Sequence, residues 1–149
     1  MRKIALLFCF ATLIFPKLAL AQRASDFKQK AAAEALPPIV ASGLEAYKAK
    51  GPEEAVRAWI KGSPMDGSKD ALSQANVLRQ VQDFYGAYQS YDVVSLRDTS
   101  PHINVIYLVL NYEKGPLFAK FVLYRADTGW ILTSFNFNAK EEAIFPTNP

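Results

Sequence analysis

Residues 103–138 read INVIYLVLNYEKGPLFAKFVLYRADTGWILTSFNFN, and this stretch decides the fold. Apolar and aromatic side chains recur at every second position, which is the period of a β-strand. Two groups of turn-forming residues, Glu113–Pro116 and Asp127–Gly129, divide the stretch into three strands, and a fourth strand precedes it. The expected ranges are 91–97, 103–112, 117–126 and 130–138. The connections are too short for crossovers, so the strands are expected to form an antiparallel meander.

The turn residues also predict how the strands pair. A four-residue loop over Glu113–Pro116 pairs Tyr112 with Leu117, and a three-residue loop over Asp127–Gly129 pairs Ala126 with Trp130. These registers place on one face, the expected core, Ile106, Leu108, Leu110, Leu117, Phe121, Leu123, Ile131, Phe135 and Phe137. The opposite face is too apolar for one that meets only water, and it holds Val105, Tyr107, Val109, Phe118, Lys120, Val122, Tyr124, Trp130, Leu132, Ser134 and Asn136.

Helices are expected before the strands. Pro37 and Pro38 split an alanine-rich region into two short helices, roughly 25–36 and 40–49. Gly51-Pro52-Glu53-Glu54 is a strong helix start, and this helix runs to Lys61. After a loop over 63–68, Asp70 is expected to cap the longest helix, whose apolar residues recur at three- and four-residue steps. The sequence therefore predicts an α+β fold, with N-terminal helices packed on a curved four-stranded antiparallel sheet.

The first 21 residues indicate export. Arg2 and Lys3 precede an apolar run that is too short to span a membrane, and Ala19-Leu20-Ala21 is typical of a signal-peptidase site. Cleavage after Ala21 leaves 128 of the 149 residues, enough for one domain over 22–149 with its ordered core at about 40–140. The expected product is periplasmic or secreted, without a membrane anchor. Cys9 leaves with the signal peptide, so no disulfide is expected.

Charge and composition argue against several classes of function. Removal of Arg2, Lys3 and Lys17 leaves 14 basic side chains against 14 acidic ones, and the basic residues are scattered. Without a basic surface, nucleic-acid binding is not expected. One histidine, dispersed acids and no cysteine in the mature chain predict no metal site and no cofactor.

This order of elements resembles the cystatin-like or nuclear transport factor 2-like superfamily, a cone-shaped α+β fold. The resemblance covers roughly residues 40–140 and rests on Tyr107–Leu117 and on the strand that begins Gly129-Trp130. Small secreted bacterial members without an established function are the nearest in appearance. Residues 62–69 are too few for the hairpin that the fuller family pattern has there, so a shorter variant without an early hairpin is expected. The resemblance also implies that members often pair through the sheet.

Relatives of this fold include isomerases and cyclases that need a titratable group inside an apolar cone, opposite a tyrosine or a protonated acid. On the expected core face the strands carry no Asp, Glu or His, and the polar groups there are Tyr112, Thr133, Asn104 and Arg125. No catalytic residue is therefore predicted, although a helix could contribute Asp83 or Glu45. His102, with Asp98 four residues earlier, lies in a polar loop where a histidine is usually solvated. The candidate ligand-binding residues are Trp59, Tyr85, Tyr88, Tyr112 and Thr133, for which ordinary core packing is the alternative.

The leading hypothesis is an exported non-enzymatic domain that binds a protein partner or a small apolar ligand. A self-complementary dimer would cover the apolar outer face, and its expected interface residues are Tyr107, Val109, Val122, Tyr124, Trp130 and Leu132. The alternative hypothesis is a small isomerase-, dehydratase- or hydrolase-like enzyme that uses the cone between the sheet and the helices. An inhibitor or immunity protein is also compatible with export and fold.

Overall fold

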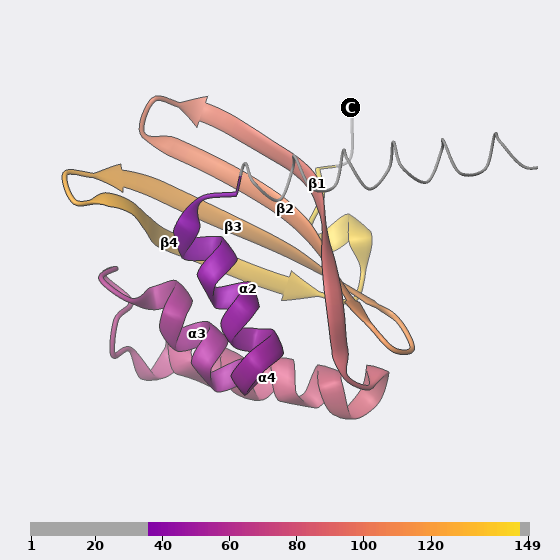
Figure 1. Cartoon of the computed structure of the whole chain (residues 1–149). Helices are drawn as coiled ribbons and strands as arrows, with labels where there is room; N and C mark the ends of the chain where they lie inside the picture. Colours follow the sequence, from indigo (N-terminus) through magenta and orange to yellow (C-terminus); the bar gives the residue numbers. More distant parts are fainter. Residues whose placement is uncertain (1–35, 147–149) are drawn as a thin grey trace, which may run out of the picture.

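The computed structural model describes residues 36–146. The predicted signal peptide and its cleavage site lie outside these residues, as does nearly all of the helix expected over 25–36. Within these residues, three helices precede four strands and a short 3₁₀-helix (Figure 1). Their bounds are α2 Pro38–Lys50, α3 Pro52–Ile60, α4 Lys69–Tyr85, β1 Tyr88–Ser100, β2 Ile103–Tyr112, β3 Pro116–Ala126, β4 Gly129–Asn138 and η1 Glu141–Ala143. This is the predicted α+β arrangement.

The strands form one antiparallel sheet in the order β1-β2-β3-β4, so the expected meander is confirmed. The sheet is curled but not closed, α2 and α3 cover its concave face, and η1 lies behind it (Figure 1). The β1–β2 and β3–β4 connections lie at one end of the molecule, and the β2–β3 hairpin lies at the other. Three register irregularities in β1 leave two evenly paired stretches of four residues, Ser90–Val93 and Ser95–Asp98.

The helices begin largely as their sequences predict. Gly51, with a φ of 92°, precedes Pro52 at the start of α3, and Glu53 and Glu54 occupy the first turn. The N-cap of α4 is Ser68 rather than the expected Asp70, because the Ser68 side chain accepts a hydrogen bond from the Ala71 amide at 3.4 Å.

The first predicted register is wrong by two residues. The Tyr112 amide donates to the Gly115 carbonyl at 3.0 Å, so the hairpin loop has two residues rather than four. Leu110 consequently pairs with Leu117, not with Ala119. Because the shift is even, every side chain keeps its predicted face.

The second predicted register is correct for only half of its length. Ala126 pairs with Gly129 instead of Trp130, and an irregularity between Val122 and Leu123 then restores the predicted pairing of Phe121 with Phe135. Thr133 is the extra residue of this bulge. Between the turn and the bulge the two faces are therefore exchanged relative to the prediction. Leu132 pairs with Leu123 in the core and is fully buried, whereas Ile131 pairs with Tyr124 on the outer face.

Trp59 anchors the helices to the sheet. Its indole Nε1 donates to the Val40 carbonyl at 3.1 Å, and its ring packs edge-on against Phe121 at 5.1 Å and beside Phe137 at 5.8 Å. Gly43 of α2 lies directly against the indole, where a Cβ atom would overlap the ring. Large apolar side chains thus fill the centre of the space between the helices and the concave face of the sheet, which we call the cone. Polar groups gather at the two ends of this space.

Candidate functional site

An open hollow of about 800 Å³ lies at the end of the cone that holds the β1–β2 and β3–β4 connections. We call it the mouth. Its lining comes from the first residue of α2 and the two residues before it, from all four strands and from the β1–β2 turn. The lining residues are Leu36, Pro37, Pro38, Leu96, Asp98, Ser100, Pro101, Asn104, Arg125 and Trp130. Asp98 and Arg125 are the charged residues in this lining. The mouth therefore combines apolar walls with a small number of polar groups, as ligand sites usually do.

Asn104 is the most constrained polar residue of the mouth. It pairs with Asp98 of β1 and with Leu123 of β3, and it is only 5 % exposed. Its amide Nδ2 donates to the Asp98 carboxylate at 3.2 Å, whereas its buried Oδ1 has no hydrogen-bond partner among the described residues. A buried acceptor left unpaired costs about 1–3 kcal/mol. Asn104, a residue of the lining, therefore carries a buried carbonyl oxygen that is unsatisfied.

Arg125 and Trp130 form the opposite part of the lining. They pair across β3 and β4, and the guanidinium carbon of Arg125 lies 5.8 Å from the centre of the Trp130 ring. The register of β3 with β4 between the turn and the bulge brings Trp130 to the core face. The prediction that placed Trp130 at an outer-face interface is therefore wrong. The residue lines the mouth instead.

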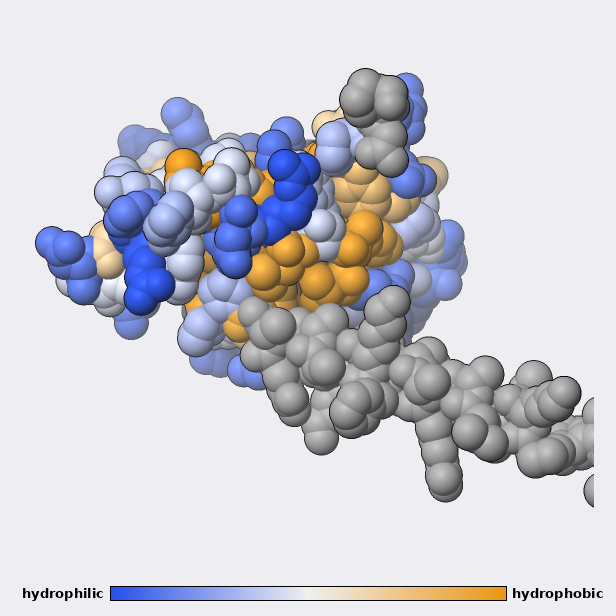
Figure 2. All heavy atoms as spheres, turned by 90° about the horizontal axis from the view of Figure 1, so that it is seen from above, coloured by the Kyte–Doolittle hydropathy of each residue, from blue (hydrophilic) through white to orange (hydrophobic). Residues whose placement is uncertain are grey.

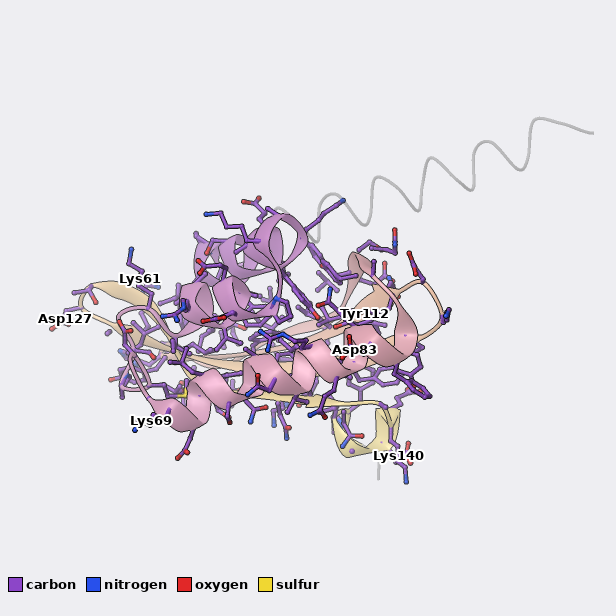
Figure 3. All side chains as sticks on the ribbon, turned by 90° about the horizontal axis from the view of Figure 1, so that it is seen from below. Lys61, Lys69, Asp83, Tyr112, Asp127 and Lys140 are labelled. Carbon is purple, nitrogen blue, oxygen red and sulfur yellow. The ribbon has the colours of Figure 1, made fainter. Side chains whose placement is uncertain are left out.

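Four tyrosines gather at the other end of the cone. The Tyr47 and Tyr112 hydroxyls are hydrogen-bonded at 2.8 Å, Tyr47 and Tyr88 stack at 4.7 Å, and the Tyr85 ring lies 6.5 Å from that of Tyr112. Figure 3 shows Tyr112 behind the C-terminal half of α4, at the opposite end of the molecule from Asp127 of the β3–β4 turn. The structure thus brings together three predicted ligand-binding residues, Tyr85, Tyr88 and Tyr112, but far from the mouth.

Burial keeps the hydroxyls of Tyr47, Tyr88 and Tyr112 neutral. Desolvation raises the pKa of Tyr47 to about 12, partly offset by the hydrogen bond from Tyr112. Desolvation likewise raises the pKa values of Tyr88 and Tyr112 far above the usual range. Hydroxyls with raised pKa values are poor bases and nucleophiles near neutral pH. The tyrosine cluster is best described as a polar part of the core.

The other two predicted ligand-binding residues lie elsewhere. Trp59 is fully buried among core aromatics. Thr133 is exposed at the β4 bulge, where its hydroxyl donates to the Val122 carbonyl at 3.1 Å. Neither lines the mouth, so the five predicted residues do not form a single site.

The outer face of the sheet is partly covered by the end of the described chain. Phe145, just after η1, packs edge-on against Tyr107 at 5.7 Å and against Phe118 at 5.4 Å. Tyr107 is buried as a result, and Val109 and Val122 are half-buried. Tyr124 remains 44 % exposed beside the exposed Ile103. The predicted interface is therefore smaller than expected, and Leu132 cannot belong to it because its side chain lies in the core.

Apolar side chains also reach the surface on the β1 side of the molecule. Figure 2 looks down on this side and shows an apolar area interrupted by hydrophilic side chains. Partly buried Val93 and Leu96 of β1 pack against the core here. Leu96 also lines the mouth.

The remaining titratable candidates do not converge. Asp83 and Glu45 lie exposed on their helices (Figure 3 labels Asp83), and His102 is exposed with its ring over Tyr124 at 6.3 Å. Asp98 is the one of these candidates that lines the mouth. Residues 36–146 contain no group of three His, Cys, Asp or Glu side chains that could hold a metal ion.

The sequence places Asn104 and Arg125 among the polar groups of the expected core face without assigning them to a site. Tyr47 and Leu36 are not among its candidate residues. The pairing of Asp98 with Asn104 could not be predicted from the turn alone. Ser100 pairs with Ile103 across the β1–β2 turn, and an irregularity between Asp98 and Ser100 then shifts the register by one residue.

Within the described part of the chain, no helix has the length and apolar character needed to cross a membrane. Comparison with known proteins found no match: no protein-family model, no curated protein and no solved structure is significantly similar to this chain. The resemblance to the cystatin-like superfamily therefore stays a prediction, and the function has to be argued from the geometry of the mouth.

Proposed function

We propose that the protein is an exported, non-enzymatic domain that binds a small ligand with an apolar body in its mouth. The observation that carries this proposal is the buried Asn104 Oδ1, which lacks a partner in the lining of an 800 Å³ hollow. An acceptor in such a place gains a hydrogen bond when a ligand supplies an N–H or O–H group. Leu36, Leu96 and Trp130 supply apolar surface around it.

The residues that line the mouth suit the binding of a ligand better than they suit acid–base catalysis. Catalysis of that kind needs an acid and a base that are both close to the reacting atoms. The mouth offers one carboxylate, that of Asp98, which already accepts the Asn104 amide. The hydroxyls of the tyrosine cluster lie at the other end of the cone. The enzyme hypothesis therefore remains the weaker alternative.

A ligand screen tests this proposal. The protein is purified from cells that express the full-length sequence, examined by native mass spectrometry for a retained small molecule, and screened for thermal stabilisation. A ligand at 100 times its Kd adds about 2.7 kcal/mol, which raises the Tm of a domain of this size by roughly 10 °C.

Two variants locate the site. Asn104→Leu removes the unpaired acceptor and should abolish the thermal shift, whereas Tyr124→Ala on the outer face should leave it unchanged. A protein that retains no molecule and responds to no compound would argue against the proposal, as would a ligand that binds Asn104→Leu as tightly as the parent.

A second candidate is self-association through the outer face. Ile103 and Tyr124 pair across β2 and β3, and both side chains are more than a third exposed. The half-buried Val105 and Val122 lie beside them on the same face. This is a smaller surface than the sequence predicted, because Phe145 covers Tyr107 and Phe118.

Size-exclusion chromatography with light scattering tests the second candidate. A dimer that Tyr124→Glu converts to a monomer would support it, with Phe84→Glu as the control because Phe84 is exposed on α4. A monomer at high protein concentration, or a dimer insensitive to Tyr124→Glu, would rule this interface out.

A further inference from the structure

The hydrogen bond between Asn104 and Asp98 fixes which way the Asn104 amide points. A carboxylate can only accept, so the nitrogen of the amide must face Asp98, at 3.2 Å, and the carbonyl oxygen must face away from it. The group that lacks a partner is therefore an acceptor. With the Asp98 carboxylate beside it, this side of the mouth holds an unpaired acceptor and a negative charge.

Two neighbouring acceptors, one of them charged, complement an ammonium group. An ammonium has three N–H donors and a positive charge, so it can bond to Asn104 Oδ1 and offset the negative charge of Asp98. A neutral hydroxyl would satisfy Asn104 but leave the carboxylate unbalanced. This part of the mouth thus favours a protonated amine.

Arg125 gives the mouth a second charge of opposite sign. Within residues 36–146 no carboxylate lies within ion-pair distance of its guanidinium, which instead lies over the Trp130 ring. A guanidinium offers paired N–H donors that fit a carboxylate. A ligand carboxylate would therefore find a partner here.

The strand register sets the distance between the two charges. Asp98 pairs with Asn104, Asn104 pairs with Leu123, and Arg125 lies two residues farther along β3 on the same face. Two strand spacings and two residues correspond to about 12 Å between the Cα atoms of Asp98 and Arg125. This separation is on the order of the length of a short extended peptide.

We infer that the ligand is a small zwitterion with an apolar side chain, such as an amino acid or a short peptide, whose ammonium group binds Asp98 and Asn104 and whose carboxylate binds Arg125. Leu96 and Trp130 contact its apolar part. This inference rests on the proposed function and specifies the chemical class that the mouth takes. The two charges of the lining cancel, so a ligand with both signs matches the mouth better than a simple cation or anion.

Isothermal titration calorimetry with matched probes tests the inference on the protein purified from full-length expression. The probes are leucine, leucyl-leucine, N-acetyl-leucyl-leucine without an ammonium group, leucyl-leucine amide without a carboxylate, and N-acetyl-leucyl-leucine amide without either charge. At least one zwitterion should bind at least tenfold more tightly than its blocked forms. Leucine against leucyl-leucine distinguishes a single amino acid from a peptide.

Variants assign the two ends of the ligand. Asp98→Asn should remove the preference of about tenfold in affinity for a free ammonium group. Arg125→Gln should likewise remove the preference of about tenfold for a free carboxylate. Asp83→Asn and Lys140→Gln, which neutralise exposed charges outside the mouth, should change neither preference. The blocked probes need no variant, so the inference is tested even if Asp98→Asn does not fold.

The outcomes separate this inference from the proposed function. The proposal of a zwitterionic ligand is wrong if the uncharged probe binds as tightly as leucyl-leucine. It is also wrong if only another apolar compound binds in a way that depends on Asn104. In both cases the proposed binding function stands. If no probe and no retained compound binds, both fail.

Discussion

The hydroxyl pair of Tyr47 and Tyr112 shows how one polar contact acts inside an apolar core. The 2.8 Å hydrogen bond satisfies two groups that burial has removed from water, and Tyr47 also approaches the Leu78 carbonyl at 3.4 Å. Tyr112→Phe should therefore lower the free energy of unfolding by about 1 kcal/mol at pH 7. Chemical denaturation monitored by circular dichroism measures this loss.

The same cluster makes stability depend on alkaline pH. An unfolded tyrosine has a pKa near 10, whereas burial raises the pKa of Tyr47 to about 12 and those of Tyr88 and Tyr112 further. Above pH 10 the unfolded state loses protons that the folded state keeps. The contribution of the buried tyrosines to the free energy of unfolding is therefore fully present below pH 10. It falls as pH rises toward 12, by up to about 1.4 kcal/mol per pH unit for each tyrosine.

Denaturation curves between pH 8 and pH 12 check this slope. Tyr112→Phe should make it shallower, because one of the shifted groups is gone. Tyr124→Phe is the matched control, since Tyr124 is exposed, and it should leave the slope unchanged. Equal slopes for the parent and Tyr112→Phe would contradict the assignment.

Gly43 is required by the Trp59 indole rather than by the backbone. A methyl group at position 43 would overlap the ring, and the ring is held by Val40, Phe121 and Phe137. Gly43→Ala should destabilise the protein by about 1–3 kcal/mol despite the better helix propensity of alanine. Glu45→Ala, at an exposed position of the same helix, is the control. An unchanged Tm for Gly43→Ala would show that the indole can move.

At the scale of elements, the order and boundaries of the helices and strands could be predicted from the sequence, because strong signals mark them. The signals are Pro37-Pro38, Gly51-Pro52 and the change from helical to two-residue period, and each depends only on residues close to it in the sequence. The fold class follows from these local signals. The outer ends of β1 could not be predicted in this way, because Tyr88–Ser90 and Asp98–Ser100 extend the strand through pairing with β2.

The strand registers were harder to predict because loop composition does not fix loop length. Glu113–Pro116 fits a four-residue loop, but the Glu113 and Lys114 amides donate to Ala87 and Tyr85 carbonyls of the α4–β1 connection, which favours the tighter turn. The bulge at Thr133 depends on the packing of Leu132 into the core. These contacts join segments that are distant in the sequence. The register of β3 with β4 decides the site, because it places Trp130 in the mouth.

The segment after β4 contributes an element that strand periodicity could not predict. Phe145 covers Tyr107 and Phe118 on the outer face of the sheet, and Ile144 beside it is buried. Phe145→Ala should lower the free energy of unfolding by about 1–2 kcal/mol, because half-buried apolar surface is returned to water. Phe84→Ala should stay within about 0.5 kcal/mol, since Phe84 is 75 % exposed. Equal effects of the two changes would mean that η1 and Phe145 do not cover the sheet in solution.

At the scale of the whole molecule, burial is concentrated in the two central strands. β2 and β3 each pair on both sides, whereas β1 and β4 each pair on one side. Amide hydrogen exchange should therefore be slowest in β2 and β3 and in the part of α3 around Trp59, and faster in α4, whose buried residues are Ala71, Ala75 and Leu78. Exchange measured by mass spectrometry after proteolysis checks this order. Equal protection throughout would indicate that the molecule opens only as a single unit.

The irregularities of β1 also affect how the protein behaves among copies of itself. β1 is an edge strand, and an edge strand with a regular row of unpaired amides and carbonyls is a template on which another chain can add and begin to aggregate. Here the evenly paired stretches are four residues long, shorter than a typical strand of five or six. A foreign strand would lose its hydrogen-bond register at each break. The bulges therefore protect the longest strand of the sheet from templating aggregation, a useful property in a protein predicted to leave the cytoplasm.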